Sequence, residues 1–216
     1  VHTAQMQKKA SGIDGVTKQD YEKNLDENLE ELIKRMKTFS YRPQPVRRTY
    51  IPKGNGKMRP LGIPAYEDRL VQGVMANILN EVYEPRFLDC SYGFRPGRSA
   101  HDAIRDINQT LMCRRVNYIL DCDIKGYFDN VNHEWLMKFL EHDIADKNFL
   151  RYVKRFLKAV IMEKGVYSES SVGTPQGGQI SPVLANVYLH YVLDLWFEKA
   201  VRPNLKGEAY LSLIHI

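Results

Sequence analysis

The segment Asn117–Val131, which reads NYILDCDIKGYFDNV, constrains the possible fold more than any other part of the chain. Tyr118, Ile119 and Leu120 favour β-strands, and the apolar run is too short for a typical helix. We therefore expect a short buried strand here. Such a strand would carry Asp123 to its carboxyl end, where the strand opens into a cleft.

An acidic residue at the end of a rigid strand is suited to binding a divalent cation. Mg²⁺ takes oxygen ligands and often only one or two protein carboxylates, which leaves room for substrate phosphates in phosphoryl transfer. Asp121 lies two residues before Asp123, and residues two apart point to the same face of a strand. Either acid, or both, could bind the metal. The alternative is that the acid only forms a turn or caps a helix.

Length and composition allow a sizeable folded core. The chain has 216 residues, of which 44% are hydrophobic and 11% aromatic, so it can form one large domain or two interlocked ones. The 31 Lys and Arg exceed the 26 Asp and Glu, which gives a formal charge of +5 and a pI near 9.0. This balance is compatible with a polyanionic partner but does not require one.

The cysteines and the apolar runs bear on the compartment. The three cysteines have no zinc-binding spacing, and their odd number argues against a complete disulfide framework. We therefore expect a reducing, cytoplasmic environment. Polar residues interrupt the apolar run 183–197, so no membrane span is predicted, and the amino end does not resemble a signal peptide. The first residue is Val1 rather than Met, which suggests a fragment or a processed product.

The local patterns predict a helix-rich α+β fold with short antiparallel strands. Apolar residues at helical spacing and candidate caps at Thr17, Ser99, Asn132 and Ser181 predict several helices. These helices cover residues 17–37, 67–83, 99–112, 133–141, about 149–160, and 181–199. Residues 40–64 predict a β-hairpin around the turn Gly54-Asn55-Gly56, and residues 165–172 predict an extended segment.

The hairpin places cationic side chains on either side of its turn. Lys53 precedes the turn and Arg59 follows it. Two cations at the mouth of a cleft could bind a triphosphate. The alternative is that both are solvated charges on an exposed hairpin, which would say nothing about function.

Two further motifs combine residues suited to nucleic acids or nucleotides. SYGFRPGRS places Arg95 and Arg98 in a turn beside the aromatics Tyr92 and Phe94, a mixture that suits a nucleic-acid backbone and its bases. GTPQGGQISP has glycines that permit close approach of a ligand, and Gln176 offers an amide for hydrogen bonding. A structural turn before a helix is the competing interpretation. Neither glycine cluster matches a phosphate-binding P-loop.

Taken together and in this order, the motifs resemble those of bacterial group II intron reverse transcriptases, the polymerase half of intron-encoded maturases. The matching strings are IPKGNGKMRPLGIP, SYGFRPGRSAHDAI, DCDIKGYFDNV and GTPQGGQISPVLANVYL. The resemblance extends from about Gly12 to about Tyr210. It implies the fingers and a partial palm of a right-hand polymerase.

The resemblance implies roles at the metal site and for the incoming sugar. Asp123 matches the family's first metal-binding aspartate, and Ile124 would add its backbone carbonyl to the same Mg²⁺. Phe128 matches the aromatic under the sugar, which would disfavour a ribose 2′-hydroxyl. Asp121 and Asp129 retain a structural interpretation, as acids of a strand edge and a turn.

The resemblance also implies contacts with the nucleotide and the nucleic acid. Lys53 and Arg59 match residues that bind the triphosphate of a dNTP. Gln176 matches the residue beside the nascent base pair, and Arg95 and Arg98 lie in a region that contacts the template. The expected partners are an intron RNA template, a DNA or RNA primer and dNTPs, with two Mg²⁺ ions for the in-line displacement. We interpret His133 as the first residue of a helix.

The sequence departs from the family pattern near its end. The Tyr-x-Asp-Asp hairpin that would supply the other metal ligands is absent, and the chain ends LSLIHI without an acid after Glu208. We expect an N-terminal extension at 1–47, fingers and partial palm at 48–210, and an atypical, non-native tail at 211–216. We therefore expect a truncated fragment without polymerase activity, lacking the thumb and maturase regions.

Two other interpretations are compatible with these motifs. The chain could be an RNA-binding maturase-like module that lacks catalysis. It could also derive from a reverse transcriptase of the retron, diversity-generating or CRISPR-associated type, although SYGFRPGRSAHDAI and GTPQGGQISPVLANVYL favour the intron type.

Overall fold

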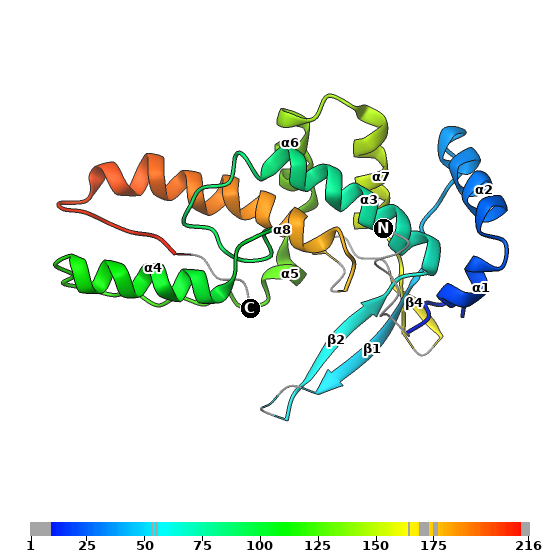
Figure 1. Cartoon of the computed structure of the whole chain (residues 1–216), viewed down its shortest axis with the longest axis horizontal. Coiled ribbons are helices and arrows are strands. Elements are labelled where there is room, and N and C mark those ends of the chain that lie inside the picture. Colours follow the sequence, from blue (N-terminus) through cyan, green and yellow to red (C-terminus); the bar gives the residue numbers. More distant parts are fainter. Residues whose placement is uncertain are drawn as a thin grey trace.

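The computed structural model describes residues 10–52, 54, 56–163, 165–168, 173–174 and 177–212. The helices are α1 (Lys18–Glu22), α2 (Leu25–Lys37), α3 (Tyr66–Tyr83), α4 (Ala100–Cys113), α5 (Tyr127–Asn130), α6 (His133–Asp143), α7 (Lys147–Leu157) and α8 (Ser181–Leu189). The π-helical turns η2 (His190–Asp194) and η3 (Phe197–Val201) and the 3₁₀ turn η4 (Arg202–Asn204) continue the direction of α8 (Figure 1). The predicted helix-rich α+β fold is confirmed.

Capping residues start several of these helices. Thr17 and Ser99 form capping boxes with Asp20 and Asp102, in which side chain and backbone satisfy each other reciprocally. Asn132 caps α6 by accepting from the amide of Trp135 at 3.0 Å. The single helix predicted at 17–37 is in fact two helices, since α1 ends at Glu22 and α2 begins at Leu25.

The strands form one small mixed sheet in the order β2-β1-β3-β4. The predicted hairpin is confirmed as β1 (Val46–Pro52) and β2 (Met58–Ile63), which pair antiparallel. β3 (Ile161–Glu163) pairs parallel with β1 and antiparallel with β4 (Val166–Ser168). The prediction of antiparallel strands is therefore wrong for the pair of β1 and β3. The far end of the hairpin projects away from the helices (Figure 1).

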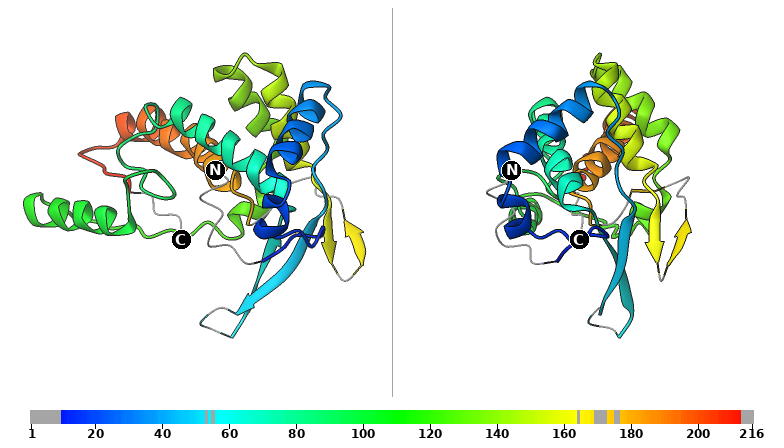
Figure 2. Two further views of the ribbon diagram at one scale, coloured as in Figure 1. Left: turned by 45° about the vertical axis from the view of Figure 1, so that its right-hand side comes forward. Right: turned by 90° about the vertical axis from the view of Figure 1, so that its right-hand side faces the viewer.

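The main core lies where α3, α6, α7 and α8 pack together (Figures 1 and 2). All four helices contribute fully buried apolar side chains to it, namely Leu79, Tyr83, Leu136, Leu140, Val153, Leu157, Leu184 and Val187. A second small cluster of Tyr21, Tyr66 and Leu70 attaches α1 to α3. Burying this apolar surface is the dominant favourable contribution to folding.

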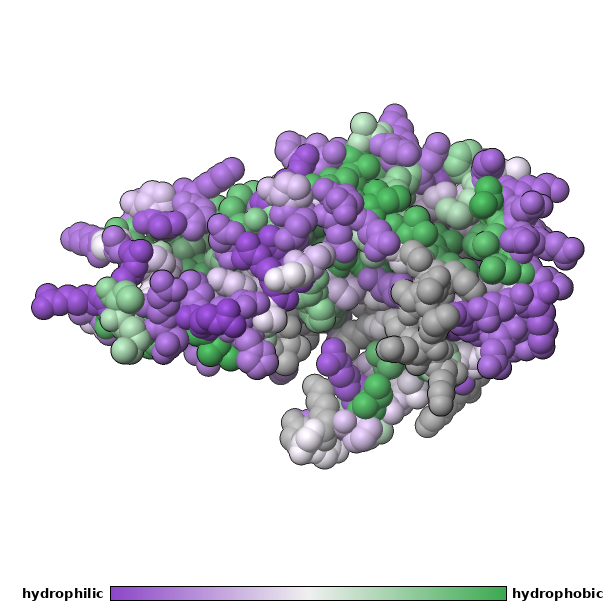
Figure 3. Space-filling model, in the orientation of Figure 1, coloured by the Kyte–Doolittle hydropathy of each residue, from purple (hydrophilic) through white to green (hydrophobic). Residues whose placement is uncertain are grey.

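The surface is mostly hydrophilic on the face drawn in Figure 3, with apolar residues gathered over α3. Val74 and Ile78 of α3 are among the exposed large hydrophobic residues. Within the described residues, no helix is both long and apolar enough to cross a membrane.

The helix predicted at 181–199 is present but irregular. Ile180, rather than Ser181, occupies the capping position and makes no side-chain cap bond, and Pro182 lies in the first turn. Beyond Leu189 the backbone becomes π-helical, a geometry that is rare and usually confined to single turns. His190 and Asp194 are buried on this part of the chain.

The prediction of a buried strand at residues 118–120, leading to Asp123, is wrong. Residues 115–124 belong to no helix or strand, and they take part in no backbone–backbone hydrogen bond within the described part of the chain. Tyr118 is 93% exposed and Leu120 is 88% exposed. A strand needs a neighbour to pair its backbone groups and a layer to cover its apolar face. The described residues supply neither, so β-favouring residues alone do not form the strand.

Candidate nucleotide-binding site

The site is built around the turn that precedes and includes α5. Gly126 begins this turn in the left-handed conformation, with φ of 62°, which glycine adopts without a steric cost. Its carbonyl accepts from the backbone amide of Asp129 at 3.1 Å and from the side-chain amide of Asn130 at 2.8 Å. The turn is thereby closed, and Phe128 is held within it.

The glycine-rich loop contacts this turn through its backbone. The amide of Thr174 donates to the carbonyl of Phe128 at 2.7 Å, and the amide of Gly173 donates to the carbonyl of Val131 at 2.8 Å. A Cβ atom at Gly173 would lie 2.8 Å from the carbonyl oxygen of Phe128. Since real Cβ atoms do not approach so closely, glycine is required here both for this contact and for its φ of 87°.

His133 adds a further bond to the same junction. Its Nε2 atom donates to the carbonyl of Gly173 at 2.5 Å. We interpreted this residue from the sequence as the start of a helix, and it is the first residue of α6. Its contact with the loop was not foreseen, since no local pattern relates residues forty positions apart.

The other end of the loop packs against the hairpin and α3. A Cβ atom at Gly177 would lie 2.2 Å from the carbonyl oxygen of Gly62 in β2. The amide of Gln179 donates to the side chain of Gln72 in α3 at 2.9 Å, and Gln72 itself is buried. The loop therefore joins the turn, the hairpin and α3. Gln72 could not be identified from the sequence, because a single polar residue on a helical pattern carries no distinct signal.

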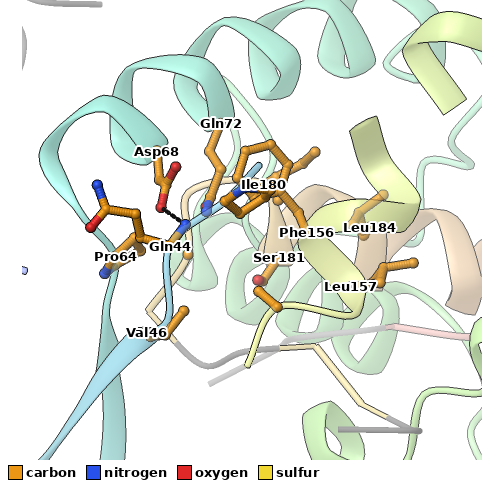
Figure 4. A pocket seen from close by; sticks show the side chains of 13 residues that line it. Gln44, Val46, Pro64, Asp68, Gln72, Phe156, Leu157, Ile180, Ser181 and Leu184 are labelled. Carbon is orange, nitrogen blue, oxygen red and sulfur yellow. Dashed lines mark hydrogen bonds between the residues drawn. The ribbon is translucent and has the colours of Figure 1, made fainter. Parts of the chain in front are cut away.

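A nearly filled cavity of about 10 Å³ lies beside this junction and has room for no more than one water molecule (Figure 4). Asp68 of α3 lines it and accepts from the amide of Gln44 at 2.9 Å and from the hydroxyl of Tyr41. Burial raises the pKa of the Asp68 carboxyl to about 6, although these two hydrogen bonds act in the opposite direction. The cavity is a hydrogen-bonded structural junction at the base of the hairpin rather than a ligand pocket.

Aromatic side chains from two separate motifs meet on one side of the turn. The ring of Phe128 lies edge-on to the ring of Phe94, with centroids 6.2 Å apart, and the ring of Tyr127 is 5.5 Å from that of Phe128. Phe94 has a positive φ of 54°, which is uncommon for a bulky residue and often marks a functional segment. Phe94 is exposed and Phe128 half-buried, so the pair offers a surface against which a sugar or a base could pack.

Tyr127 anchors the turn to the core. Its hydroxyl donates to the carbonyl of Ala185 in α8 at 2.7 Å. Burial raises the pKa of this hydroxyl above its ordinary value, so Tyr127 remains a neutral hydrogen-bond donor.

Asp123 and Ile124 are exposed at the amino end of the turn. Asp121 is exposed as well, so the structure does not distinguish the two acids by burial. Within the described residues, no group of three His, Cys, Asp or Glu could hold a metal ion. One carboxylate from this turn does not by itself form a Mg²⁺ site.

Of the two cations predicted on the hairpin, only Arg59 is among the described residues. Lys53 lies outside the described residues, and so does Gln176 of the glycine-rich loop. Arg59 is described as an exposed residue of β2 opposite Ile51 in the register. The pairing confirms the hairpin on which the two cations were predicted, while their binding role stays a prediction.

Arg95 has an internal role in the loop after α3. Its side chain is only 3% exposed and forms an ion pair with Glu84, with a closest distance of 2.8 Å. It also donates to the carbonyls of Leu88 and Ser91 at 2.7 and 2.8 Å. Most of its donor capacity is therefore used inside the protein, and contact of this guanidinium with a nucleic acid stays a prediction.

Arg98 is more accessible. It donates to the side chain of Asp89 at 2.6 Å and to the carbonyl of the same residue at 2.8 Å. Its guanidinium lies over the ring of Tyr92, 5.5 Å from the centroid. An exposed ion pair of this kind can exchange partners at little cost.

Comparison with known proteins identifies related sequences. The model of the reverse transcriptase (RNA-dependent DNA polymerase) family matches residues 51–212. The chain is similar to the group II intron-encoded protein LtrA of Lactococcus lactis subsp. cremoris, with 44% identity over 79% of this chain and 29% of that protein. It is also similar to protein YkfC of Escherichia coli K12, with 42% identity over 83% of this chain and 48% of that protein. The chain thus spans about a third to a half of these relatives.

A solved structure shares the fold. A chain of the partial Cas6-RT-Cas1–Cas2 complex matches with a TM-score of 0.55 and 20% identity. The match covers 93% of this chain and 33% of that one. At this identity the likeness shows the fold alone.

Proposed function

Since this chain belongs to the reverse transcriptase family, we propose that it comprises the fingers and partial palm of a group II intron-encoded reverse transcriptase. In this proposal residues 48–210 bind the RNA template, the primer and the incoming dNTP, and residues 1–47 are an N-terminal extension. The observation that carries the proposal is the junction of Phe128, Gly173 and Gly177. At this junction the α5 turn, the glycine-rich loop and the hairpin, which are distant in the sequence, meet at one place.

We assign Phe128 to the sugar of the incoming nucleotide. Its backbone is held by Thr174 and its ring packs against Phe94, so its position is restrained from two sides. A restrained aromatic ring at this place would exclude a 2′-hydroxyl by steric overlap. Lys53 and Arg59 would bind the triphosphate, and Gln176 would lie beside the nascent base pair.

Reverse transcriptases generally use Mg²⁺ in a two-metal site. We infer that this chain would contribute the carboxylate of Asp123 and the backbone carbonyl of Ile124, and that polymerisation requires further acids absent from this sequence. The specific partners we propose are the intron RNA and a DNA or RNA primer at its target.

The test is primer extension on an RNA template by a chain extended through a Tyr-x-Asp-Asp hairpin. We expect the extended chain to synthesise DNA and the Asp123→Ala variant to lose this activity. Asp121→Ala is the matched control, because Asp121 is also exposed and only two residues away. Polymerisation that survives Asp123→Ala but not Asp121→Ala would show that the metal ligand is wrongly assigned.

A second candidate function is RNA binding without catalysis. The observation that favours it is the lack of any potential metal-binding cluster among the described residues. A non-catalytic module would bind RNA with the same affinity with or without Mg²⁺ and would be insensitive to Asp123→Ala. It would also remain unable to extend a primer after addition of the hairpin.

A further inference from the structure

A hollow of about 360 Å³ lies between α7 and the segment that leads into β1. Five of the residues that line it are cationic, namely Arg42, Arg151, Lys154, Arg155 and Lys158. The rest of its described lining consists of proline, alanine and valine, without a carboxylate or an aromatic side chain. None of these residues belongs to the hairpin, to the α5 turn or to the glycine-rich loop.

The cations of α7 are spaced so that they repel one another. Arg151 and Arg155 are four residues apart, as are Lys154 and the C-cap residue Lys158, and like charges at this spacing repel each other. Of the ion pairs identified in the described chain, none joins any of the five cations to a carboxylate. Attraction to the carboxyl end of α7 accounts for Lys154 and Arg155 in its last turn, but not for Arg42 or Arg151.

Two of the cations are held in place by the backbone. Arg155 donates to the carbonyl of Tyr41 at 2.6 Å and to that of Phe39 at 3.1 Å. Arg42 donates to the same two carbonyls, at 3.1 and 2.7 Å. Desolvation, Arg42 and Arg151 all lower the pKa of the Arg155 guanidinium, which is consistent with a positive local field. The positive charges of Arg42 and Arg155 are thus held in position by hydrogen bonds to the backbone.

We propose that this hollow binds the phosphate backbone of RNA. The inference rests on the proposed function, in which the chain binds RNA, and adds a contact outside the candidate nucleotide site. Phosphates bind to Lys and Arg mainly through charge and counterion release, which a cluster of cations provides. The described lining offers no aromatic surface for base stacking, so binding should be independent of sequence. An acidic protein partner is less suited, because protein interfaces usually need aromatic or similar anchor pockets.

The test measures binding of a short labelled RNA hairpin of arbitrary sequence to the whole chain over a range of salt concentrations. The variant is Lys154→Gln/Lys158→Gln, since both lysines are exposed and can be changed without altering the core. The matched control is Lys34→Gln/Lys199→Gln, which removes the same charge from exposed positions outside the hollow. Circular dichroism of each variant verifies the fold.

We expect the hollow variant to bind more weakly by roughly tenfold for each lost phosphate contact at about 0.1 M salt. The slope of log K against log salt should fall in magnitude by about 0.7 to 0.9 per contact, and a second RNA sequence should behave alike. If the hollow variant and the control bind equally well, the site is overturned while RNA binding by the chain stands. If the wild-type chain binds no RNA, both proposals fail. Equal competition by polyglutamate would indicate a site for acidic proteins and would also overturn the assignment.

Discussion

Gly173 provides a sharp test of how the glycine-rich loop is joined to the α5 turn. We expect Gly173→Ala to destabilise the protein for two separate reasons. The first is its φ of 87°, which costs an L-residue about 1 to 2 kcal/mol. The second is the added Cβ atom, which would lie 2.8 Å from the carbonyl oxygen of Phe128 and 2.9 Å from that of Asp129.

The two contributions can be separated, because Gly165 has nearly the same positive φ and lies in open space. Its φ is 82° and no atom lies within 4 Å of an added Cβ. Gly165→Ala should therefore cost only the conformational strain, about 1 to 2 kcal/mol. Gly173→Ala should cost a further 1 to 3 kcal/mol or so, because backbone carbonyls cannot move aside as a flexible side chain can.

The measurement is urea denaturation of wild type and both variants, followed by circular dichroism. The difference between the two variants in free energy of unfolding reports mainly the close approach, since both glycines have a positive φ of similar size. A lowered midpoint with an unchanged slope would show that the stability itself has changed. If the two variants lose the same free energy, the loop is not in contact with the turn and the proposed junction is wrong.

Three further predictions concern other parts of the molecule. The pKa of Asp68 is raised to about 6 in the folded state from an ordinary 3.8, so the folded state binds more protons than the unfolded state between these pH values. The free energy of unfolding should therefore fall by up to about 3 kcal/mol as pH rises through that window. Asp68→Asn should remove this pH dependence in denaturation experiments at several pH values. Arg95→Ala should cost about 1 to 3 kcal/mol in urea denaturation, because it leaves the half-buried carboxylate of Glu84 and the carbonyls of Leu88 and Ser91 without their donor. Arg95→Lys should not restore this stability, and Arg98→Ala should cost within about 1 kcal/mol. In a chain extended through a Tyr-x-Asp-Asp hairpin, the amides of residues 118–123 should become protected from hydrogen exchange, and continued rapid exchange would show that the hairpin does not pair with them.

The elements that could be predicted from the sequence are those determined by local interactions. Ser99 and Asp102 lie three residues apart and satisfy each other in any chain that begins a helix there, so the cap at Ser99 was predicted from the sequence. The hairpin around residues 54–56 was equally local. The strand at 118–120 was not, because its formation depends on neighbours that the described chain does not supply.

In the candidate site, too, the local motifs could be predicted from the sequence and the contacts between them could not. The α5 turn and the glycine-rich loop were each recognised from their residues, and the resemblance to a known family related them to one function. The loop and the turn are joined by the bond from the amide of Thr174 to the carbonyl of Phe128, and the loop is joined to α3 by the bond from the amide of Gln179 to Gln72. These contacts join residues far apart in the sequence, and only the folded chain brings them together. The internal ion pair of Arg95 is of the same kind, since nothing in FRPGRS distinguishes a buried arginine from an exposed one.

The uncovered segment at 115–124 has a practical consequence for this polypeptide in concentrated solution. Tyr118, Ile119 and Leu120 expose apolar side chains, and their backbone amides and carbonyls bond to no other backbone group of the described residues. Such a stretch is a template on which another molecule can lay down a β-ladder. Two copies could pair through this segment by backbone hydrogen bonds between them. Self-association should therefore rise with protein concentration and fall when a charged residue replaces Ile119.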